Sequence, residues 1–440
     1  MSLNIKEKIA VFWFRRDLRL HDNAGLYYAL RSGYPVVPLF IFDKNILDDL
    51  ENKKDSRVTF IYQALESLRE ELKENGSDIL VHYGFPTEIW RKLSDEYDIA
   101  EVYTNTDYEP YATERDREVF KIVKKKKTAF KSCKDQVIFE KKEILTGQNS
   151  PYTVFTPYSR SWKEKVNDFY LSSYPTKKYF RHFLKWKGAA MPSLKEMGSE
   201  KTEIGFPSDK VSSALLNHYH DQRDFPAMEA TSHIGIHLRF GTVSIRELAR
   251  KAKEHSDTFL NELIWRDFYQ QILWNFPHVG TGKAFRSAYD HIKWRYDTDD
   301  FKKWCEGKTG YPLVDAGMRQ LNETGFMHNR VRMVTASFLA KHLLIDWRWG
   351  EAYFAEKLLD YDLAANNGGW QWAAGSGTDA APYFRIFNPA AQAERFDPKG
   401  EYIKKWVPEI GTDKYPEPIV DHKIARERCL RVYKEALDQK

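Results

Sequence analysis

The first third of the chain alternates short apolar runs with amphipathic segments of helical length, and this alternation constrains the fold more than any other feature. The apolar runs are 9–14, 36–42, 79–83 and 99–104, and 55–75 is one of the amphipathic segments between them. Strands that alternate with helices form right-handed βαβ units, in which the strands lie parallel in one sheet. We therefore predict an α/β domain over residues 1–135 with a doubly wound parallel sheet, which a further run at 136–139 completes.

Strand signals end in the second half of the chain. From about residue 211 the apolar residues recur with the spacing of amphipathic helices, which predicts an all-α domain over 206–440. Residues 136–205 are rich in Pro, Gly, Ser and Lys and are predicted to form a partly helical linker on the surface.

Composition excludes several classes of protein. With 42% hydrophobic residues the chain can bury a large core, so it is not predicted to be disordered. Cys133, Cys305 and Cys429 lie far apart and form no CxxC, which argues against a zinc site or a disulfide framework. No apolar run is long enough for a signal peptide or a membrane span. We expect a cytoplasmic protein with no metal and no membrane partner; its net charge of +5 does not exclude nucleic acid.

Two familiar phosphate-binding motifs are absent. No GxGxxG follows the first predicted strand, which excludes the dinucleotide fingerprint. The segment 280–283 (GTGK) is not a P-loop, because Pro277 occupies the first glycine position and Ala284 replaces the Ser or Thr. The arginine-rich segment 15–23 (RRDLRLHDN) follows the first strand instead, and it either pairs with nearby acids or binds an anion.

The segment 360–389 brings carboxylates, amides and indoles together. Asp360 and Asp362 precede an Asn-Asn-Gly-Gly sequence, which predicts a turn, and Trp370 and Trp372 follow it. Buried carboxylates need hydrogen-bonding partners, and indoles favour burial. This combination is typical of a pocket wall for a planar, hydrogen-bonding ligand, or alternatively of a buried loop between capped helices.

A predicted helix, capped by Thr258 and continuing to Phe276, is apolar on nearly every side. One face nevertheless carries Glu262, Trp265, Arg266, Tyr269 and Leu273. A carboxylate in such a helix must either form an ion pair, for example with Arg266, or face a polar cavity.

A second predicted helix, 326–344, has a stripe that is polar at its start and small further on. The stripe consists of Asn329, Arg332, Met333, Ala336 and Ala340. Arg332 is the expected partner of Asp360. Further upstream, Thr231 and Ser232 precede a helix and either hold phosphate oxygens or cap that helix.

Seven stretches, in chain order, resemble the signature stretches of DNA photolyases and cryptochromes. They are VFWFRRDLRLHDN, YTVFTPYSRSW, ELIWRDFY, EGKTGYPLVDAGMRQL, MHNRVRM, DYDLAANNGGWQW and YFRIFNP, spread from about residue 10 to about residue 410. The chain is most similar to class I photolyases for cyclobutane pyrimidine dimers. This resemblance implies an N-terminal antenna domain and a C-terminal helical domain that holds FAD in a bent conformation.

The resemblance implies a set of flavin-contacting residues. They are Tyr219, Thr231, Ser232, His233, Ile234, Gly235, Phe259, Arg266, Asn329, Arg332, Asp360, Tyr361, Asp362 and Asn366. Asn366 matches the position that faces flavin N5, where Asn is typical of photolyases and Asp or Cys is usual in cryptochromes. Gly235 stands where many members have Ser, and Phe326 and Phe259 stand where relatives often have Trp.

The resemblance also implies residues for the dimer and for DNA. They are Arg223, Glu262, Trp265, Tyr269, Asn329, Arg330, Met333, Trp372 and Gln392. Asn329 and Met333 stand where the (6-4) photolyases have His, which favours cyclobutane dimers. Catalytic roles are implied for Glu262 and for a tryptophan chain, Trp370, Trp347 and Trp294, that re-reduces the flavin. Asn105, Tyr108 and Glu109 resemble folate-contacting positions.

The implied activity is light-driven repair of DNA. Excited FADH⁻ gives an electron to a dimer flipped out of the duplex and regains it when the ring has split. Glu262, protonated among aromatic side chains, is expected to donate a hydrogen bond to the dimer. We expect a monomer without an obligate protein partner, and an antenna chromophore such as methenyltetrahydrofolate. The alternative is a cryptochrome-like blue-light sensor that repairs nothing; the short C-terminus and the intact dimer pocket argue against it.

Overall fold

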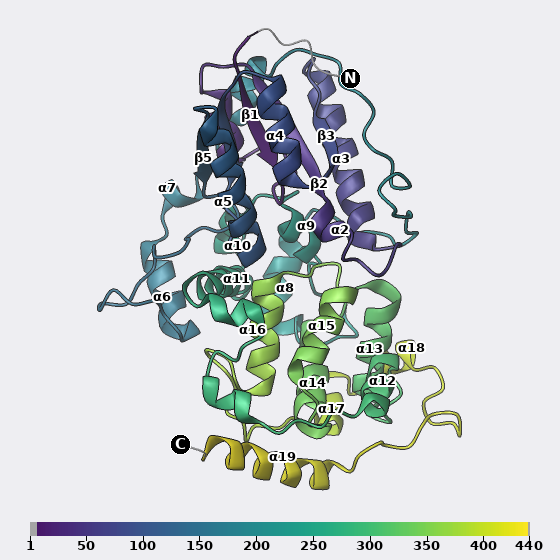
Figure 1. Ribbon diagram of the computed structural model, residues 1–440. Helices are drawn as coiled ribbons and strands as arrows, with labels where there is room; N and C mark the ends of the chain where they lie inside the picture. Colours follow the sequence, from purple (N-terminus) through teal and green to yellow (C-terminus); the bar gives the residue numbers. More distant parts are fainter. Residues whose placement is uncertain (1–6, 439–440) are drawn as a thin grey trace. The chain divides into compact units, whose positions relative to one another are not determined.

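The computed structural model describes residues 7–438 and divides into two compact units, each built from several segments of the chain (Figure 1). The α/β unit comprises the described part of Met1–Glu140 together with Val166–Lys210 and Ile234–Lys251. The helical unit comprises Lys141–Lys165, Val211–His233 and the described part of Ala252–Lys440. Each unit therefore takes in part of the segment 136–205.

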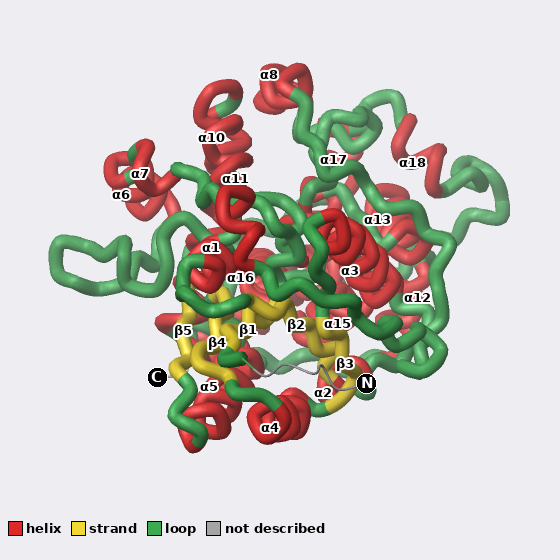
Figure 2. Tube along the Cα trace, turned by 90° about the horizontal axis from the view of Figure 1, so that it is seen from above, coloured by secondary structure: helices red, strands yellow, loops and turns green. Residues whose placement is uncertain are grey.

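A five-stranded parallel sheet forms the centre of the α/β unit, as the sequence predicts (Figure 2). Its strands are β1 (Ile9–Phe14), β2 (Val36–Asp43), β3 (Leu80–Gly84), β4 (Ile99–Asn105) and β5 (Ala129–Cys133), in the spatial order β3-β2-β1-β4-β5. The order reverses between β1 and β4, as in doubly wound folds. The predicted last strand is wrong. Residues 136–139 belong to none of the five strands and have irregular backbone, although Val137, Ile138 and Phe139 are buried.

Helices cover both faces of this sheet. Helices α1 (Ala24–Leu30) and α3 (Ser56–Glu74) lie on one face, and α4 (Pro86–Glu96) and α5 (Pro110–Lys125) on the other (Figure 2). Trp13 of β1 meets Trp90 of α4 edge to face, with ring centroids 5.5 Å apart. The remaining elements of the unit are α2 (Lys44–Leu47), α7 (Asp168–Leu171), η1 (Thr176–His182) and α9 (Gly235–Phe240), and α10 (Ile245–His255) begins in it.

The arginine-rich segment after β1 forms ion pairs inside the α/β unit. Arg19 lies 2.7 Å from a carboxylate oxygen of Asp135. Arg246 donates to Asp135 at 2.7 Å and to Asp22 at 2.9 Å. All four side chains are at most 5% exposed, so each charge depends on its partners, because an unpaired buried charge is costly. Of the two interpretations of the segment 15–23, these contacts support the ion pairs.

We expect the α/β unit to lose stability in acid through Asp135. Burial by itself would raise the pKa of this carboxyl. The two neighbouring cations, Arg19 and Arg246, together outweigh burial, so the pKa lies below its usual 3.8. A carboxyl with a lowered pKa stabilises the fold above its unfolded pKa, and this contribution is lost as the pH falls through the folded pKa. Thermal unfolding measured from about pH 7 to about pH 2 should show a falling Tm below about pH 4. The Asp135→Asn variant should have a lower Tm at neutral pH, and its Tm should fall less steeply as the pH is lowered. An equally steep fall of the Tm in this variant would contradict the assignment to Asp135.

The helical unit contains no strand among its described residues, in agreement with the predicted all-α domain. Most of the predicted site residues lie on α8 (Ser213–Gln222), α11 (Asp257–Asn275), α14 (Asn329–Ser337) and α16 (Leu363–Ala374). The other helices are α6 (Phe155–Lys165), α12 (Thr298–Glu306), α13 (Pro312–Thr324), α15 (Trp347–Lys357), α17 (Pro389–Phe396), α18 (Glu401–Trp406) and α19 (His422–Leu437), with the short η2 (Pro277–Thr281), η3 (Ser287–His291) and η4 (Phe338–His342).

Two predicted helix boundaries are wrong for local reasons. Helix α11 begins two residues earlier than predicted, because Ser256 and not Thr258 is its cap: the Ser256 hydroxyl accepts from the backbone N–H of Phe259 at 3.3 Å. Helix α14 begins only after His328, whose Nδ1 accepts from the backbone N–H of Arg330 at 3.1 Å. A π-helical turn, η4, follows Ser337 directly.

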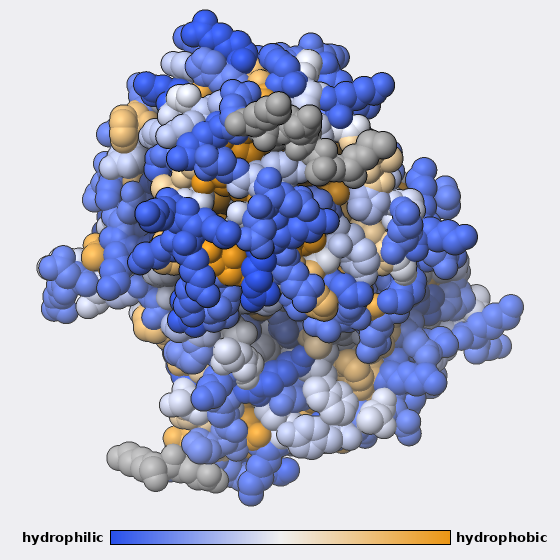
Figure 3. Space-filling model, turned by 45° about the horizontal axis from the view of Figure 1, so that its top comes forward, coloured by the Kyte–Doolittle hydropathy of each residue, from blue (hydrophilic) through white to orange (hydrophobic). Residues whose placement is uncertain are grey.

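The described surface is largely hydrophilic. Figure 3 shows hydrophilic residues over most of its visible face, with small apolar patches between them. Large exposed apolar side chains such as Phe169, Tyr296 and Phe384 are widely spaced along the chain. No helix within residues 7–438 has both the length and the apolar character needed to cross a bilayer.

Candidate functional site

The Asn-Asn-Gly-Gly sequence lies inside a helix, so the predicted turn is wrong. Helix α16 begins after Asp362, whose carboxylate accepts from the backbone N–H of Ala365 at 3.2 Å. The side-chain amide of Gln270 in α11 donates to both oxygens of Asp362, at 3.0 and 3.1 Å. This cap and the packing against α11 outweigh the low helix propensity of the two glycines.

Gly368 and Gly369 occupy the middle of α16 for different reasons. A Cβ at Gly368 would lie 2.2 Å from Cε1 of Tyr269, so glycine allows α11 and α16 to approach closely. A Cβ at Gly369 would meet no atom within 4 Å, and this glycine is exposed. Helix α16 therefore has one packed side and one open side, and Asn366 lies one turn before Gly369 on the open side.

Asn366 is held by a residue that the sequence does not indicate. Its side-chain amide donates to Glu351 of α15, to the backbone carbonyl at 3.1 Å and to the carboxyl at 2.9 Å. Burial raises the pKa of Glu351, and the hydrogen bond from Asn366 partly offsets this rise. Because both N–H groups of the amide point to Glu351, the Oδ1 atom of Asn366 remains as a hydrogen-bond acceptor.

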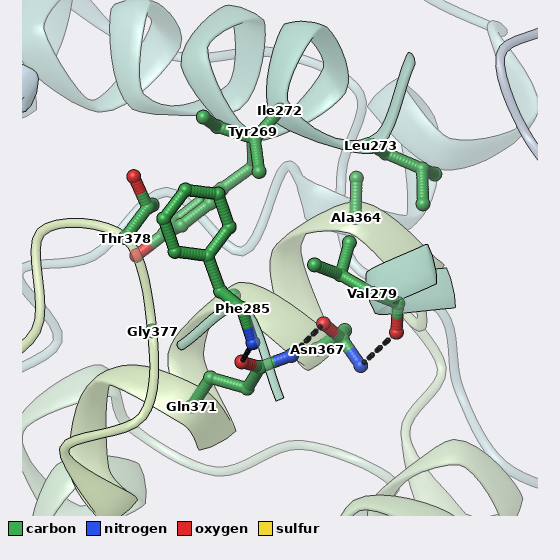
Figure 4. A pocket seen from close by; sticks show the side chains of 11 residues that line it. Tyr269, Ile272, Leu273, Val279, Phe285, Ala364, Asn367, Gln371, Gly377 and Thr378 are labelled. Atoms are coloured by element: carbon green, nitrogen blue, oxygen red, sulfur yellow. Dashed lines mark hydrogen bonds between the residues drawn. The ribbon is translucent and has the colours of Figure 1, made fainter. Parts of the chain in front are cut away.

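A second pair of amides fixes the opposite side of α16. Figure 4 shows Asn367 and Gln371 among the residues that line a small pocket. Gln371 donates to Oδ1 of Asn367 at 2.9 Å and accepts from the backbone N–H of Phe285 at 2.7 Å, and Asn367 donates to the carbonyl of Val279 at 3.1 Å (Figure 4). The second Asn of the motif and the Gln between its two tryptophans are therefore structural, and only their spacing of four residues in a helix could have indicated this.

Three neighbouring helices leave a set of polar and aromatic side chains partly or fully exposed. We call this set the open strip: Glu262, Trp265, Arg266 and Tyr269 on α11, Asn329, Arg332 and Met333 on α14, and Asn366, Gly369 and Trp372 on α16. Helix α16 packs against both α11 and α14. Leu273, predicted on the same face of α11, is buried, as are Ala336 and Ala340 beyond Met333. Accessible acids, amides, guanidinium groups and indoles on largely buried helices are typical of a ligand site.

Arg332 and Asp360 form the predicted ion pair. Nη2 of Arg332 lies 3.0 and 3.2 Å from the two carboxylate oxygens of Asp360. Nε of Arg332 donates to the backbone carbonyl of Met327 at 2.7 Å, which fixes the guanidinium plane.

Glu262 forms an ion pair with an arginine. Nη1 of Arg223 lies 2.5 Å from Oε1 of Glu262, whose side chain is 34% exposed. This contact differs from the expected protonated acid among aromatic side chains. Arg330 has a similar partner, because its Nη2 lies 2.9 Å from Oδ1 of Asp224. Arg330 also lies over the ring of Phe396, with 4.2 Å between the guanidinium carbon and the ring centroid.

Trp265 has one aromatic face covered. Its ring stacks on Phe155 with centroids 3.7 Å apart and only 3° between the planes. Tyr269 lies beside it, with a centroid distance of 5.4 Å. Trp372 at the other end of the open strip lies 6.3 Å from Phe387. Trp265 is still partly exposed, so it can stack on a second ring.

The predicted phosphate-binding run is divided between the two units. Thr231, Ser232 and His233 belong to the helical unit, and Ile234 and Gly235 to the α/β unit, where Gly235 begins α9. His233 has a left-handed backbone (φ 52°) and lies 4.0 Å from the ring of Phe326. Such strain in a non-glycine residue is common at ligand sites. Thr231, His233 and Phe326 line a hollow of about 470 Å³ that α18 closes on another side.

The other predicted residues of the helical unit are placed as follows. Tyr219 packs edge to face on Phe259, with centroids 5.2 Å apart. Tyr361 directly precedes the cap of α16, and Gln392 lies half-buried on α17. Trp294, Trp347 and Trp370 are buried in one apolar cluster. The ring of Trp370 contacts Phe354 and Trp304, at centroid distances of 5.0 and 6.0 Å, and the sequence did not single out either of these.

The three residues predicted to contact an antenna chromophore have partners inside the α/β unit. The amide of Asn105 donates to Asp17 and Asn23, and its oxygen accepts from the backbone of Gly25. The hydroxyl of Tyr108 donates to Glu140 at 2.7 Å. Glu109 pairs with Arg16 and Arg239. These side chains therefore help to hold the carboxyl ends of the strands together.

Comparisons with known proteins cover nearly the whole chain. Residues 10–178 match the family model described as DNA photolyase, and residues 259–412 match the FAD binding domain of DNA photolyase. The deoxyribodipyrimidine photo-lyase of Halobacterium salinarum is 38% identical, over 97% of this chain and 99% of that protein. A class III photolyase from Agrobacterium tumefaciens superimposes with a TM-score of 0.87 at 32% identity, over 99% of each chain. A Sulfolobus tokodaii photolyase with two FAD molecules gives a TM-score of 0.80 at 33% identity, over 98% of this chain and 100% of that chain.

Proposed function

The chain belongs to the DNA photolyase family, and we propose on that premise that it splits cyclobutane pyrimidine dimers in DNA by light-driven electron transfer. The observation that carries the proposal is the open strip of the helical unit. It combines a carboxylate, neutral amides and an indole with one covered face, on helices whose other residues are largely buried.

The open side of α16 fits the isoalloxazine ring of FAD. Gly369 leaves space for a planar ring, and Asn366 presents a carbonyl oxygen to a protonated ring nitrogen. Arg332, held by Asp360, supplies fixed donors at the next helix. When bound and reduced, FAD would supply light-driven one-electron chemistry to the dimer, with the electron returned after the ring has split.

The protein's own residues bind and orient the dimer. Trp265 and Trp372 offer ring faces on which pyrimidines stack, each contributing about 1–3 kcal/mol. The amide of Asn329 donates a neutral hydrogen bond to a pyrimidine carbonyl, and Met333 beside it fills apolar space. Excluding water from the strip strengthens these hydrogen bonds in the reacting state.

Arginines beside the open strip bind the phosphates that flank the lesion. We expect Arg330→Ala to weaken binding of both damaged and undamaged DNA, and to reduce the slope of log K against log salt by about 1, because one phosphate contact is lost. Fluorescence anisotropy over a range of salt concentrations measures this slope. Arg117→Ala is the matched control, because Arg117 is 62% exposed on α5 and pairs only locally with Glu114. An unchanged slope in Arg330→Ala would remove Arg330 from the DNA contact.

A substrate panel tests the proposed function. Purified, FAD-loaded protein is illuminated with oligonucleotides that carry a cyclobutane dimer, a (6-4) photoproduct or no damage, and the products are separated by chromatography. We expect restored thymines from the cyclobutane dimer only, and only in the light. Repair of the (6-4) product instead would contradict the substrate class, and repair of neither would favour a light sensor.

A further inference from the structure

The arginine proposed to bind DNA and the carboxylate proposed to contact the dimer bind each other in the structure. Nη1 of Arg223 lies 2.5 Å from Oε1 of Glu262. As long as this pair exists, the arginine cannot bind a phosphate through the same N–H group. A carboxylate also cannot donate a hydrogen bond to a dimer carbonyl, because it has no proton to give. The two proposed roles therefore require the pair to separate when DNA binds.

Tyrosines and acids surround the pair of Arg223 and Glu262. Arg223 and Tyr219, from the end of α8, and Tyr269, from its own helix, interact with the Glu262 carboxylate. Asp224 lies near Arg223 and Tyr219, and Asp379 lies near Tyr269. Burial, followed by the nearby Glu262 carboxylate, raises the pKa of Tyr219, so that this tyrosine stays neutral. Moving Arg223 to a phosphate therefore removes the cation that lies against the Glu262 carboxylate.

We propose that Arg223 passes from Glu262 to a DNA phosphate when a dimer binds, and that Glu262 takes up a proton from solvent in this exchange. The inference rests on the proposed function. One O–H bond forms on Glu262, one buffer molecule loses a proton, and no electron moves. The resulting carboxylic acid can donate to a dimer carbonyl, and the lesion covers it from water. Arg223 is thereby a positioning residue that couples DNA binding to the protonation of Glu262.

The neighbouring pair of Arg330 and Asp224 provides a matched control. Its atoms lie 2.9 Å apart, and the side chain of Asp224 is 40% exposed. If a phosphate takes Arg330, Asp224 remains beside water, where a carboxylate stays ionised. Each of the two pairs joins an acid to an arginine that we propose to bind DNA. Replacing Asp224 should nevertheless leave the proton uptake unchanged.

Proton uptake is measured by calorimetry in the dark. FAD-loaded protein is titrated with a short duplex that carries one thymine dimer, at about pH 7, in buffers of different ionisation enthalpy. We expect an uptake approaching one proton per complex, and an affinity that falls up to tenfold for each unit by which the pH rises. Glu262→Gln should abolish both effects, whereas Asp224→Asn should retain them. The undamaged duplex should cause no uptake.

The outcomes separate this inference from the proposed function. Tight, dimer-specific binding by the natural protein without proton uptake would mean that Glu262 stays ionised, for example beside Arg266. This result would overturn the proposed exchange of Arg223 from Glu262 to a phosphate. It would leave the proposed repair of dimers unaffected. Proton uptake that persists in Glu262→Gln assigns the proton to another group and also overturns it. Equal affinity for damaged and undamaged DNA contradicts the proposed function itself, and the inference falls with it. The flavin absorbance of each variant confirms that it is folded and loaded.

Discussion

Replacing Gly369 by alanine should give a protein that folds normally but has lost most of its FAD. A Cβ at this position meets no protein atom within 4 Å, so the chain can accommodate it. Alanine also favours the helix by about 1 kcal/mol relative to glycine, so the flavin-free protein should unfold at a slightly higher temperature. The same methyl group would occupy the space that we assign to the flavin ring. The absorbance ratio of flavin to protein, measured after purification, gives the loss of FAD.

The matched control is Gly368→Ala, one residue earlier. Its Cβ would lie 2.2 Å from the ring of Tyr269, which forces α11 and α16 apart. Such overpacking costs about 1–3 kcal/mol, so this variant should be less stable whether or not FAD is present. If Gly369→Ala retained its full content of FAD, the flavin would not lie on the open side of α16.

Replacing Trp265 by alanine should weaken binding of dimer-containing DNA by about 5- to 150-fold, the equivalent of about 1–3 kcal/mol for one stacked base. Phe155 already covers one face of this indole at 3.7 Å, so the ring is held ready to stack on a pyrimidine with its other face. Binding of undamaged DNA should change little, because that binding depends mainly on phosphate contacts.

Trp265→Phe and Trp274→Ala are the controls for this experiment. The phenylalanine retains an aromatic face and should recover part of the affinity. Trp274 lies on the same helix, where Lys141 covers its ring at 4.8 Å, and no role in the dimer site is proposed for it. Equal losses for damaged and undamaged DNA in Trp265→Ala would mean that the indole supports the fold and not the lesion.

The fold could be predicted wherever burial alone decides the structure. Strands β1, β2 and β4 are buried or nearly so, and their sequences are apolar runs that mark them directly. Strand β5 was missed because it lies at the edge of the sheet and its sequence, AFKSC, is mostly exposed and polar. The sequence predicts a strand at the nearby apolar run 136–139 instead, although burial of such a run does not require a strand.

The helix α16 shows why local propensity failed at the site. Asn-Asn-Gly-Gly favours a turn in isolation, but the cap at Asp362 and the close approach of Tyr269 to Gly368 stabilise a helix. Most contacts between residues that are far apart in the sequence could not be predicted from it. The pairing of Arg332 with Asp360 was predicted, whereas Glu351 beside Asn366 and Asp224 beside Arg330 follow only from how the helices pack.

The most direct test is a flash experiment on the FAD-loaded, reduced protein bound to a dimer-containing oligonucleotide. A near-UV or blue flash should raise the absorbance at about 260 nm, because splitting the dimer restores two conjugated thymines, while the flavin spectrum returns to its starting state. The same complex kept in the dark should not change. Permanent oxidation of the flavin without a rise near 260 nm, or an equal rise in the dark, would contradict light-driven dimer splitting by this protein.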